Sequence, residues 1–278
     1  MSSEPAAAPT GDGPVPLLSD ERITTYLARM GLTEPVAPTV DALEQLHLAH
    51  VLAVPFENLD IHLGRPIRLD TAGLHDKIVT RRRGGFCYEL NGLFAGLLRG
   101  IGFDVALVGS SVWMPDGSLS PPLDHLALLV EADGTRLVDV GFGETFTVPH
   151  RLGAEWTEPA ARWRTVPIDG GWRLQADEGA GWTDVYDLDT APRRFNEFGP
   201  RCHWHQTDDD SFFRHLPFVS QAKPDGRVTI MGDHRIVRSD GTRIERSVAE
   251  LGGILDAATG HFDASVLEQL EQPAEGRQ

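Results

Sequence analysis

The chain has 278 residues, of which 41 are acidic and 25 are basic, so its formal net charge at pH 7 is −16. This acidity argues against a nucleic-acid-binding protein, because binding to phosphates requires a basic surface. Two cysteines, Cys87 and Cys202, are too few for a disulfide framework, and no apolar run reaches the roughly 20 residues of a membrane-spanning helix. We therefore expect a reduced, cytoplasmic globular protein.

The N-terminal third of the chain has the residue pattern of helices. Residues 1–17 are rich in Ala, Pro and Gly, and we expect them to be disordered. Apolar residues then recur at helical spacing over residues 23–30, and a second helix is predicted after Thr39. A third helix is predicted to begin at Tyr88, directly after a glycine-rich turn, and to end at Gly100.

Beyond Val105 the apolar period changes to two, which is typical of strands, and this pattern continues to about Leu188. Turn sequences predict hairpins at Asp116-Gly117, Asp133-Gly134 and Asp169-Gly170-Gly171. Two short helices close the chain, after further strands predicted at residues 218–222, 228–231 and 236–238. Helices, then antiparallel strands, then a mixed region indicate an α+β fold and not alternating βαβ units.

Cys87 is a candidate nucleophile because of its position. It follows Gly84-Gly85-Phe86 at the start of the third predicted helix, whose N-terminus offers free N–H groups and a partial positive charge. Both features stabilise a thiolate, and the N–H groups could also stabilise the oxyanion formed when a thiolate attacks a carbonyl. The alternative for a single cysteine is a small buried apolar residue, which is our interpretation of Cys202.

A thiol nucleophile needs a base, and the base needs a group that orients it. His125 opens an apolar β run. Asp139 lies in the next run between apolar neighbours, where a carboxylate requires a partner. We therefore select His125, one of 11 histidines in the chain, as the base, and Asp139 as the carboxylate that orients it. The imidazolium of His125 would stabilise the Cys87 thiolate.

The length of the intervening turn decides whether His125 and Asp139 can meet. A two-residue loop at Asp133-Gly134 would pair Asp139 with Leu128 and place it on the opposite face from His125. A three-residue loop at residues 132–134, with its glycine at positive φ, places both residues on one face. A Cys–His–Asp site therefore requires the three-residue loop.

These residues lie within longer segments that resemble the arylamine N-acetyltransferase family. The stretch RGGFCYELN at residues 83–91 resembles the active-site signature of that family. Further segments resemble family landmarks in the same order along the chain, at residues 54–59, 125–128, 138–143 and 202–213. The resemblance extends from about residue 19 to residue 270.

The resemblance implies a three-domain acyltransferase with a cysteine-protease-like core. Cys87 would be the nucleophile, His125 the base and Asp139 the orienting residue, acting on acetyl-CoA and an arylamine, arylhydrazine or arylhydroxylamine, without a metal. The expected parts are a disordered tail (1–17), a helical domain with the nucleophile (18–103), an antiparallel β-barrel with the histidine and aspartate (104–200), and a C-terminal mixed α/β lid (201–278).

The resemblance also suggests which residues contact the substrates. The expected substrate-binding residues are Phe56, Phe142, Gly143, Phe146, Ser211 and Phe213. Plain core packing is the alternative for the aromatic residues that follow Asp139. The polar residues around the cysteine are expected to form a hydrogen-bonded network, because charges near a core need partners. The alternative is that they lie on a solvated helix face. These residues are Glu57, Arg83, Glu89 and Asn91.

One residue differs from the family pattern, and one segment could instead suggest a metal site. Asp124 precedes the histidine where many relatives of the family have Thr, and its carboxylate could change the field around the base. The histidines at 203 and 205 could suggest a metal site, but on a strand Cys202 would point away from both, so we expect structural roles.

Two other functions use the same three residues. One is a macrolactam-forming amide synthase that acts on polyketide thioesters, and the other is a cysteine hydrolase that acts on peptides. Acylation of Cys87 by acetyl-CoA would favour transfer of acetyl groups over both. The sequence does not identify the acceptor amine, the preferred acyl chain or the oligomeric state.

Overall fold

The computed structural model describes residues 17–33, 37–144, 146–159, 161–239, 242–251 and 261–270. The predicted disorder of residues 1–16 lies outside this part of the chain. Among the described residues, every helix is too short or too polar to span a bilayer.

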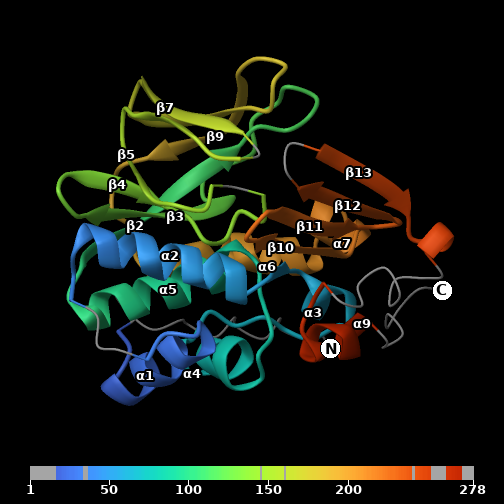
Figure 1. The fold of residues 1–278 in the computed structure, drawn as a ribbon, viewed down its shortest axis with the longest axis horizontal. Coiled ribbons are helices and arrows are strands. Elements are labelled where there is room, and N and C mark those ends of the chain that lie inside the picture. The colour runs from blue at the N-terminus through green and yellow to red at the C-terminus, as the bar shows by residue number, and fades with distance from the viewer. Residues whose placement is uncertain are drawn as a thin grey trace, which may run out of the picture.

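The N-terminal region is helical, as the sequence pattern predicts (Figure 1). Thr39 starts the second helix by accepting a hydrogen bond from the Ala42 N–H. Helix α5 (Cys87–Ile101) begins at Cys87 itself. It ends before Gly102, whose φ of +111° stops a helix. The helices are α1 (Asp20–Arg29), α2 (Val40–Ala53), α3 (Leu59–His62), α4 (Thr71–His75), the π-helical turn η1 (Asp76–Thr80) and α5 (Cys87–Ile101).

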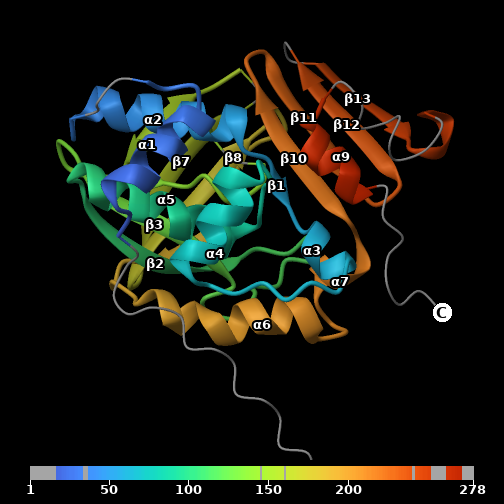
Figure 2. The ribbon, with the colours of Figure 1, turned by 90° about the horizontal axis from the view of Figure 1, so that it is seen from below.

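Helix α5 lies between other elements on both sides, which is why its first three turns are buried. Figure 2 shows α5 between α2 and α6 (Gly199–Thr207). A Cβ at Gly92 would lie 2.4 Å from the Phe195 ring, so this position is restricted to glycine although glycine costs a helix about 1 kcal/mol relative to alanine. Gly92 therefore lets α5 pack closely against Phe195.

An eight-stranded antiparallel sheet curls into a nearly closed barrel, with strand order β5-β4-β3-β2-β9-β8-β7-β6 (Figure 1). Side chains such as Val108, Leu174 and Tyr186 fill its interior. The strands are β2 (Asp104–Val112), β3 (His125–Glu131), β4 (Thr135–Val138), β5 (His150–Arg151), β6 (Glu155–Thr157), β7 (Arg162–Ile168), β8 (Gly171–Asp177) and β9 (Thr183–Asp189).

A second antiparallel sheet, with order β1-β10-β11-β12-β13, combines one strand from the N-terminal region with four strands from the C-terminal region. Its first strand comes from the N-terminal region, and Phe56 in it pairs with Ser220. The strands are β1 (Phe56–Glu57), β10 (Phe218–Lys223), β11 (Gly226–Met231), β12 (His234–Ser239) and β13 (Thr242–Ser247).

Short helices precede and follow the C-terminal strands of this sheet along the chain, and α6 spans the predicted domain boundary at residue 200. Besides α6, they are η2 (Phe195–Phe198), α7 (Phe212–His215), η3 (Ala249–Leu251) and α9 (Ala264–Leu270). The α+β class and the central barrel are as expected from the sequence and the resemblance.

Candidate active site

A close contact with β1 holds the turn that precedes Cys87. The Glu57 N–H donates a hydrogen bond to the Gly85 carbonyl over 2.8 Å. A Cβ on Gly84 would lie 2.1 Å from the Pro55 carbonyl oxygen, so only glycine fits there. The turn delivers Cys87 as the first residue of α5, with 3% of its surface exposed.

Five buried charged side chains form a network beneath this turn. Arg83 contacts Glu57 over 2.7 Å and Asp60 over 3.0 Å. Lys77 contacts Asp60 over 2.7 Å and Glu89 over 2.9 Å. Each charge has a partner of opposite sign, as buried charges require. Glu57, Arg83 and Glu89 lie in this network as predicted. The predicted fourth member, Asn91, contacts Asp139 instead, and sequence reasoning missed Lys77 and Asp60.

Glu89 joins this network to the start of α5. Its Oε2 accepts a hydrogen bond from the Phe86 N–H over 3.1 Å, which is half of a capping box. Burial raises the pKa of Glu89 to about 7, while the charge of Lys77 acts in the opposite direction. This carboxyl therefore changes its protonation near neutral pH.

His125 and Asp139 form a buried pair. His125 Nε2 lies 2.8 Å from Asp139 Oδ2. The carboxylate also accepts hydrogen bonds from the Tyr186 hydroxyl (3.0 Å), the Asn91 amide (2.8 Å) and the Gly141 N–H (3.0 Å). Burial acts to raise the pKa of Asp139, but His125 and these donors hold it below its ordinary value. Asp139 is thus held in its ionised form beside the imidazole of His125.

The turn between β3 and β4 has the three-residue form that this pair requires. Glu131 pairs with Thr135, so the loop consists of residues 132–134. Gly134 has a φ of +91°, in the region that favours glycine. The prediction from strand parity is therefore confirmed.

Asn91 connects α5 to both strands of this hairpin. It lies one helical turn after Cys87, and its side chain donates to the Leu126 carbonyl (2.6 Å) and accepts from the Val140 N–H (2.9 Å). The contact is close, since a Cβ on Gly141 would lie 2.9 Å from the Cys87 Cα. The start of α5 is thereby fixed against the start of β3 and the segment after β4.

The surroundings of Cys87 oppose an isolated thiolate. Burial raises the pKa of the Cys87 thiol, whereas the backbone N–H of Leu126 acts to lower it. A proton transfer from the thiol to His125 is different, because it leaves the net charge of the site unchanged and pairs the imidazolium with Asp139. The thiolate–imidazolium pair stays a prediction that depends on this joint transfer.

Aromatic residues gather beside the histidine. The Phe142 ring lies edge-on to the His125 imidazole, with the ring centroids 5.1 Å apart. Gly143 follows with a φ of +88°, and a Cβ there would lie 3.3 Å from the Phe56 ring. Phe56 in turn contacts Phe213, with centroids 6.0 Å apart. Four of the predicted substrate-binding residues thus form one connected group.

The other two predicted substrate-binding residues lie elsewhere. Phe146 is fully buried in the barrel, stacked on His47 at 5.7 Å and edge-on to Trp156 at 5.5 Å. Ser211 is fully buried, and its hydroxyl donates to the His205 carbonyl over 3.0 Å. Core packing and an internal hydrogen bond already occupy these side chains, so contact of either residue with the substrate stays a prediction.

Sequence reasoning missed two residues that hold Asp139. Tyr186 comes from β9, which reaches the site only because the sheet curls into a barrel. His47 comes from α2, and its Nδ1 donates to the Thr147 carbonyl over 2.8 Å. Its Nε2 lies 3.2 Å from the Asp139 carbonyl oxygen and 3.4 Å from the Asp139 nitrogen. No local motif marks either residue.

The segment with Cys202 is helical, so the expectation of a strand there is wrong. The Cys202 sulfur is buried and lies 3.4 Å from the Gln206 side-chain nitrogen. Among the described residues, no group of three or more His, Cys, Asp and Glu side chains could hold a metal ion.

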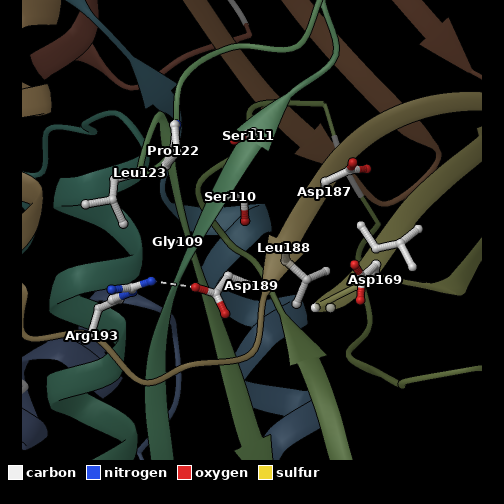
Figure 3. A pocket seen from close by; sticks show the side chains of 13 residues that line it. Gly109, Ser110, Ser111, Pro122, Leu123, Asp169, Asp187, Leu188, Asp189 and Arg193 are labelled. Carbon is white, nitrogen blue, oxygen red and sulfur yellow. Dashed lines mark hydrogen bonds and ion pairs between the residues drawn. The ribbon is translucent and has the colours of Figure 1, made fainter.

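A separate cavity of about 370 Å³ lies beside β2 and β9 (Figure 3). Asp187 and Asp189 line it, but each is paired with an arginine, Arg173 and Arg193 respectively. Ser111, which lies opposite Asp187 in the register of β2 and β9, also lines the cavity. Leu188, a residue of the barrel core, lines the cavity as well, whereas His125 and Asp139 do not.

The chain is similar to known N-acetyltransferases in sequence and in fold. The model of the N-acetyltransferase family matches residues 39–268. Arylamine N-acetyltransferase / N-hydroxyarylamine O-acetyltransferase of Salmonella typhimurium is 37% identical over 227 residues, which cover 80% of each chain. Arylamine N-acetyltransferase of Escherichia coli is 33% identical over 84% of this chain and 87% of its own. The structure of Mycobacterium marinum arylamine N-acetyltransferase in complex with CoA aligns with a TM-score of 0.82 and 30% identity, covering 89% of this chain and 94% of that chain.

Proposed function

Because the chain belongs to the arylamine N-acetyltransferase family, we propose that it transfers acetyl from acetyl-CoA to arylamines, arylhydrazines or arylhydroxylamines through an acyl-enzyme on Cys87. As a member of this family it is an enzyme that takes its acetyl group from acetyl-CoA. The observation that carries the proposal is the buried His125–Asp139 pair, 2.8 Å apart, fixed against the first turn of α5 by Asn91.

In the first half of the reaction, Cys87 attacks the thioester carbonyl of acetyl-CoA. His125 takes the thiol proton, and Asp139 stabilises the imidazolium. The free N–H groups at the start of α5 stabilise the oxyanion of the tetrahedral intermediate. The bond to the CoA sulfur then breaks, and CoA leaves with the proton from His125. The acetyl group remains on the Cys87 sulfur.

In the second half, the amine nitrogen attacks the carbonyl of the acyl-enzyme. His125 removes a proton from the nitrogen as the new C–N bond forms, and the bond to the Cys87 sulfur breaks. An aromatic amine is neutral at pH 7, so its lone pair is available without further deprotonation. We propose that Phe142, Phe56 and Phe213, with the small residue Gly143 between them, hold the aromatic ring of the acceptor.

We further propose that the enzyme works in the reducing cytoplasm. Both cysteines are buried and unpaired, and a reducing environment keeps a nucleophilic thiol in its reduced form. Its partners would then be small molecules, a coenzyme A thioester and an aromatic amine.

The test is intact-mass analysis of the protein after mixing with acetyl-CoA and with longer acyl-CoA thioesters. We expect a stable acetyl adduct on the wild-type protein and none on Cys87→Ala. Cys202→Ala is the matched control and should be acetylated normally, because that sulfur is buried in α6. If Cys87→Ala retained wild-type transfer activity, the proposal would be wrong.

The same experiment separates the two alternative functions. Acylation by long polyketide-like thioesters, with none by acetyl-CoA, would indicate an amide synthase that closes macrolactams. Turnover of peptides without acylation by any CoA thioester would indicate a hydrolase.

A further inference from the structure

One face of the second sheet contacts the loop that follows β4. Phe56 lies opposite Ser220 in the register of β1 and β10, and Ser220 lies opposite Thr229 in that of β10 and β11, so the three side chains share this face. Arg227, two residues before Thr229 on β11, points to the same side, and so does Arg238, which lies opposite Arg227 on β12. The face therefore has an aromatic end on β1 and a polar end on β11 and β12.

The polar end of this face holds Gly143 and Glu144. The Arg227 guanidinium donates a hydrogen bond to the Gly143 carbonyl. The Thr229 hydroxyl donates to Glu144 Oε1 over 2.8 Å, and Arg238 donates to the same oxygen over 2.8 Å. Three side chains from two neighbouring strands thus hold two consecutive residues of the loop.

Further contacts fix the Arg227 side chain. It also donates to Ser220 Oγ over 3.2 Å, and the Ser220 and Thr229 hydroxyl oxygens lie 2.9 Å apart. Burial lowers the pKa of Arg227 to about 10, while the charge of Glu144 acts in the opposite direction, so the guanidinium is charged at neutral pH. Its bond to the Gly143 carbonyl is therefore a charge-assisted hydrogen bond, which is stronger than one between neutral groups.

The same loop supplies the aromatic ring beside the base. Phe142, which precedes Gly143, lies edge-on to the His125 imidazole, with the ring centroids 5.1 Å apart. A Cβ on Gly143 would lie 3.2 Å from the Phe218 ring and 3.3 Å from the Phe56 ring. Because glycine is free to adopt many backbone conformations, contacts from the sheet are needed to hold Gly143 at its φ of +88°. A different conformation at Gly143 would shift the Phe142 ring relative to His125.

We propose that Arg227 is a positioning residue for the aromatic acceptor: its hydrogen bond to the Gly143 carbonyl holds the Phe142 ring beside the base. The proposal rests on the proposed function, in which Phe142 contacts the ring of the acceptor. The bond matters for the second half of the reaction, because a misplaced acceptor attacks the acyl-enzyme less often. Acetylation of Cys87 depends on it much less, because Asn91 fixes the start of α5 against the base and its partner.

The experiment measures the two half-reactions separately in Arg227→Met, which keeps the length of the side chain and loses its hydrogen-bond donors. Acetylation of Cys87 by acetyl-CoA is followed by mass analysis without acceptor, and removal of the acetyl group is then followed at increasing concentrations of aniline. We expect the half-maximal aniline concentration to rise at least about tenfold, because a hydrogen bond from a charged group is lost. The acetylation rate should stay within about twofold of wild type, because Asn91 still fixes the start of α5.

Three further variants separate positioning from damage to the fold. Arg227→Lys keeps a charged donor and should recover part of the loss in aniline affinity. Thr229→Val has the same shape as threonine but loses the donor to Glu144, so it should raise the half-maximal aniline concentration about threefold, and it decides the question if Arg227→Met does not fold. Arg246→Met is the matched control, because Arg246 is exposed on β13 of the same sheet, and it should behave as wild type.

Hydrogen exchange checks the contact without any acetyl transfer. The amides of residues 140–144 should exchange faster in Arg227→Met than in wild type, while those of α5 should not change, and unchanged exchange over residues 140–144 would overturn the proposal. Equal half-maximal aniline concentrations in wild type, Arg227→Met and Thr229→Val would also overturn it, as would equal slowing of both half-reactions. If the wild-type protein were not acetylated at Cys87, the proposed function itself would be wrong, and this proposal with it.

Discussion

The substitution Glu89→Gln tests the electrostatics of the turn that carries the nucleophile. Glu89 is buried among Lys77 and two other carboxylates, and its pKa is raised from 4.5 to about 7, mainly by burial. Between these pH values the folded protein binds more protons than the unfolded chain, so the free energy of unfolding falls as pH rises. Each pH unit in this window removes about 1.4 kcal/mol, which gives a total of about 3 kcal/mol.

Glutamine keeps the shape of Glu89 and can accept the Phe86 N–H, but it does not titrate. Relative to wild type, Glu89→Gln should therefore gain about 3 kcal/mol of unfolding free energy between pH 4.5 and 7.5. Denaturant unfolding of both proteins at several pH values measures this difference, with Glu21→Gln on the exposed face of α1 as the control. A difference that is constant with pH, or that shrinks as pH rises, would refute the reasoning.

Three further predictions concern catalysis. Initial-rate plots at several acceptor concentrations should be parallel, because one thiol holds the acetyl group between two separate half-reactions, and intersecting lines would indicate direct transfer. Asp139→Asn should keep the fold but slow Cys87 alkylation at pH 6 by at least tenfold, since the imidazolium loses its buried partner, and an unchanged rate would remove Asp139 from the site. Gly134→Val should lower acetylation severalfold, because valine is strained at the φ of +91° that this loop position has. Full activity of this variant would show that the hairpin register tolerates the strain.

The sequence predicts those parts of the site that local patterns specify. The glycine turn and the helix start identify Cys87, and strand parity correctly requires a three-residue loop between His125 and Asp139. Helix boundaries followed caps such as Thr39, and turn glycines marked the hairpin ends. These features depend on residues close together in the chain.

Long-range contacts account for what the sequence does not reveal. Tyr186 bonds to Asp139 only because β9 pairs with β2 when the sheet curls into a barrel. Strand β1 pairs with a strand from the C-terminal region. Because β1 has only two residues, it shows no periodicity from which this pairing could be predicted. Phe146 is expected beside the substrate from its place after Asp139, and the sequence does not reveal that its side chain packs in the barrel core.

The central claim is that the acetyl group passes through the Cys87 sulfur. Peptide mass analysis of the protein quenched within one turnover of mixing with acetyl-CoA, in the absence of acceptor, tests it most directly. We predict one acetyl group per chain, on the peptide that contains Cys87, and its complete loss when an aromatic amine is added. Acetylation of any other residue, or an acetyl group on Cys87 that an aromatic amine does not remove, would contradict the mechanism.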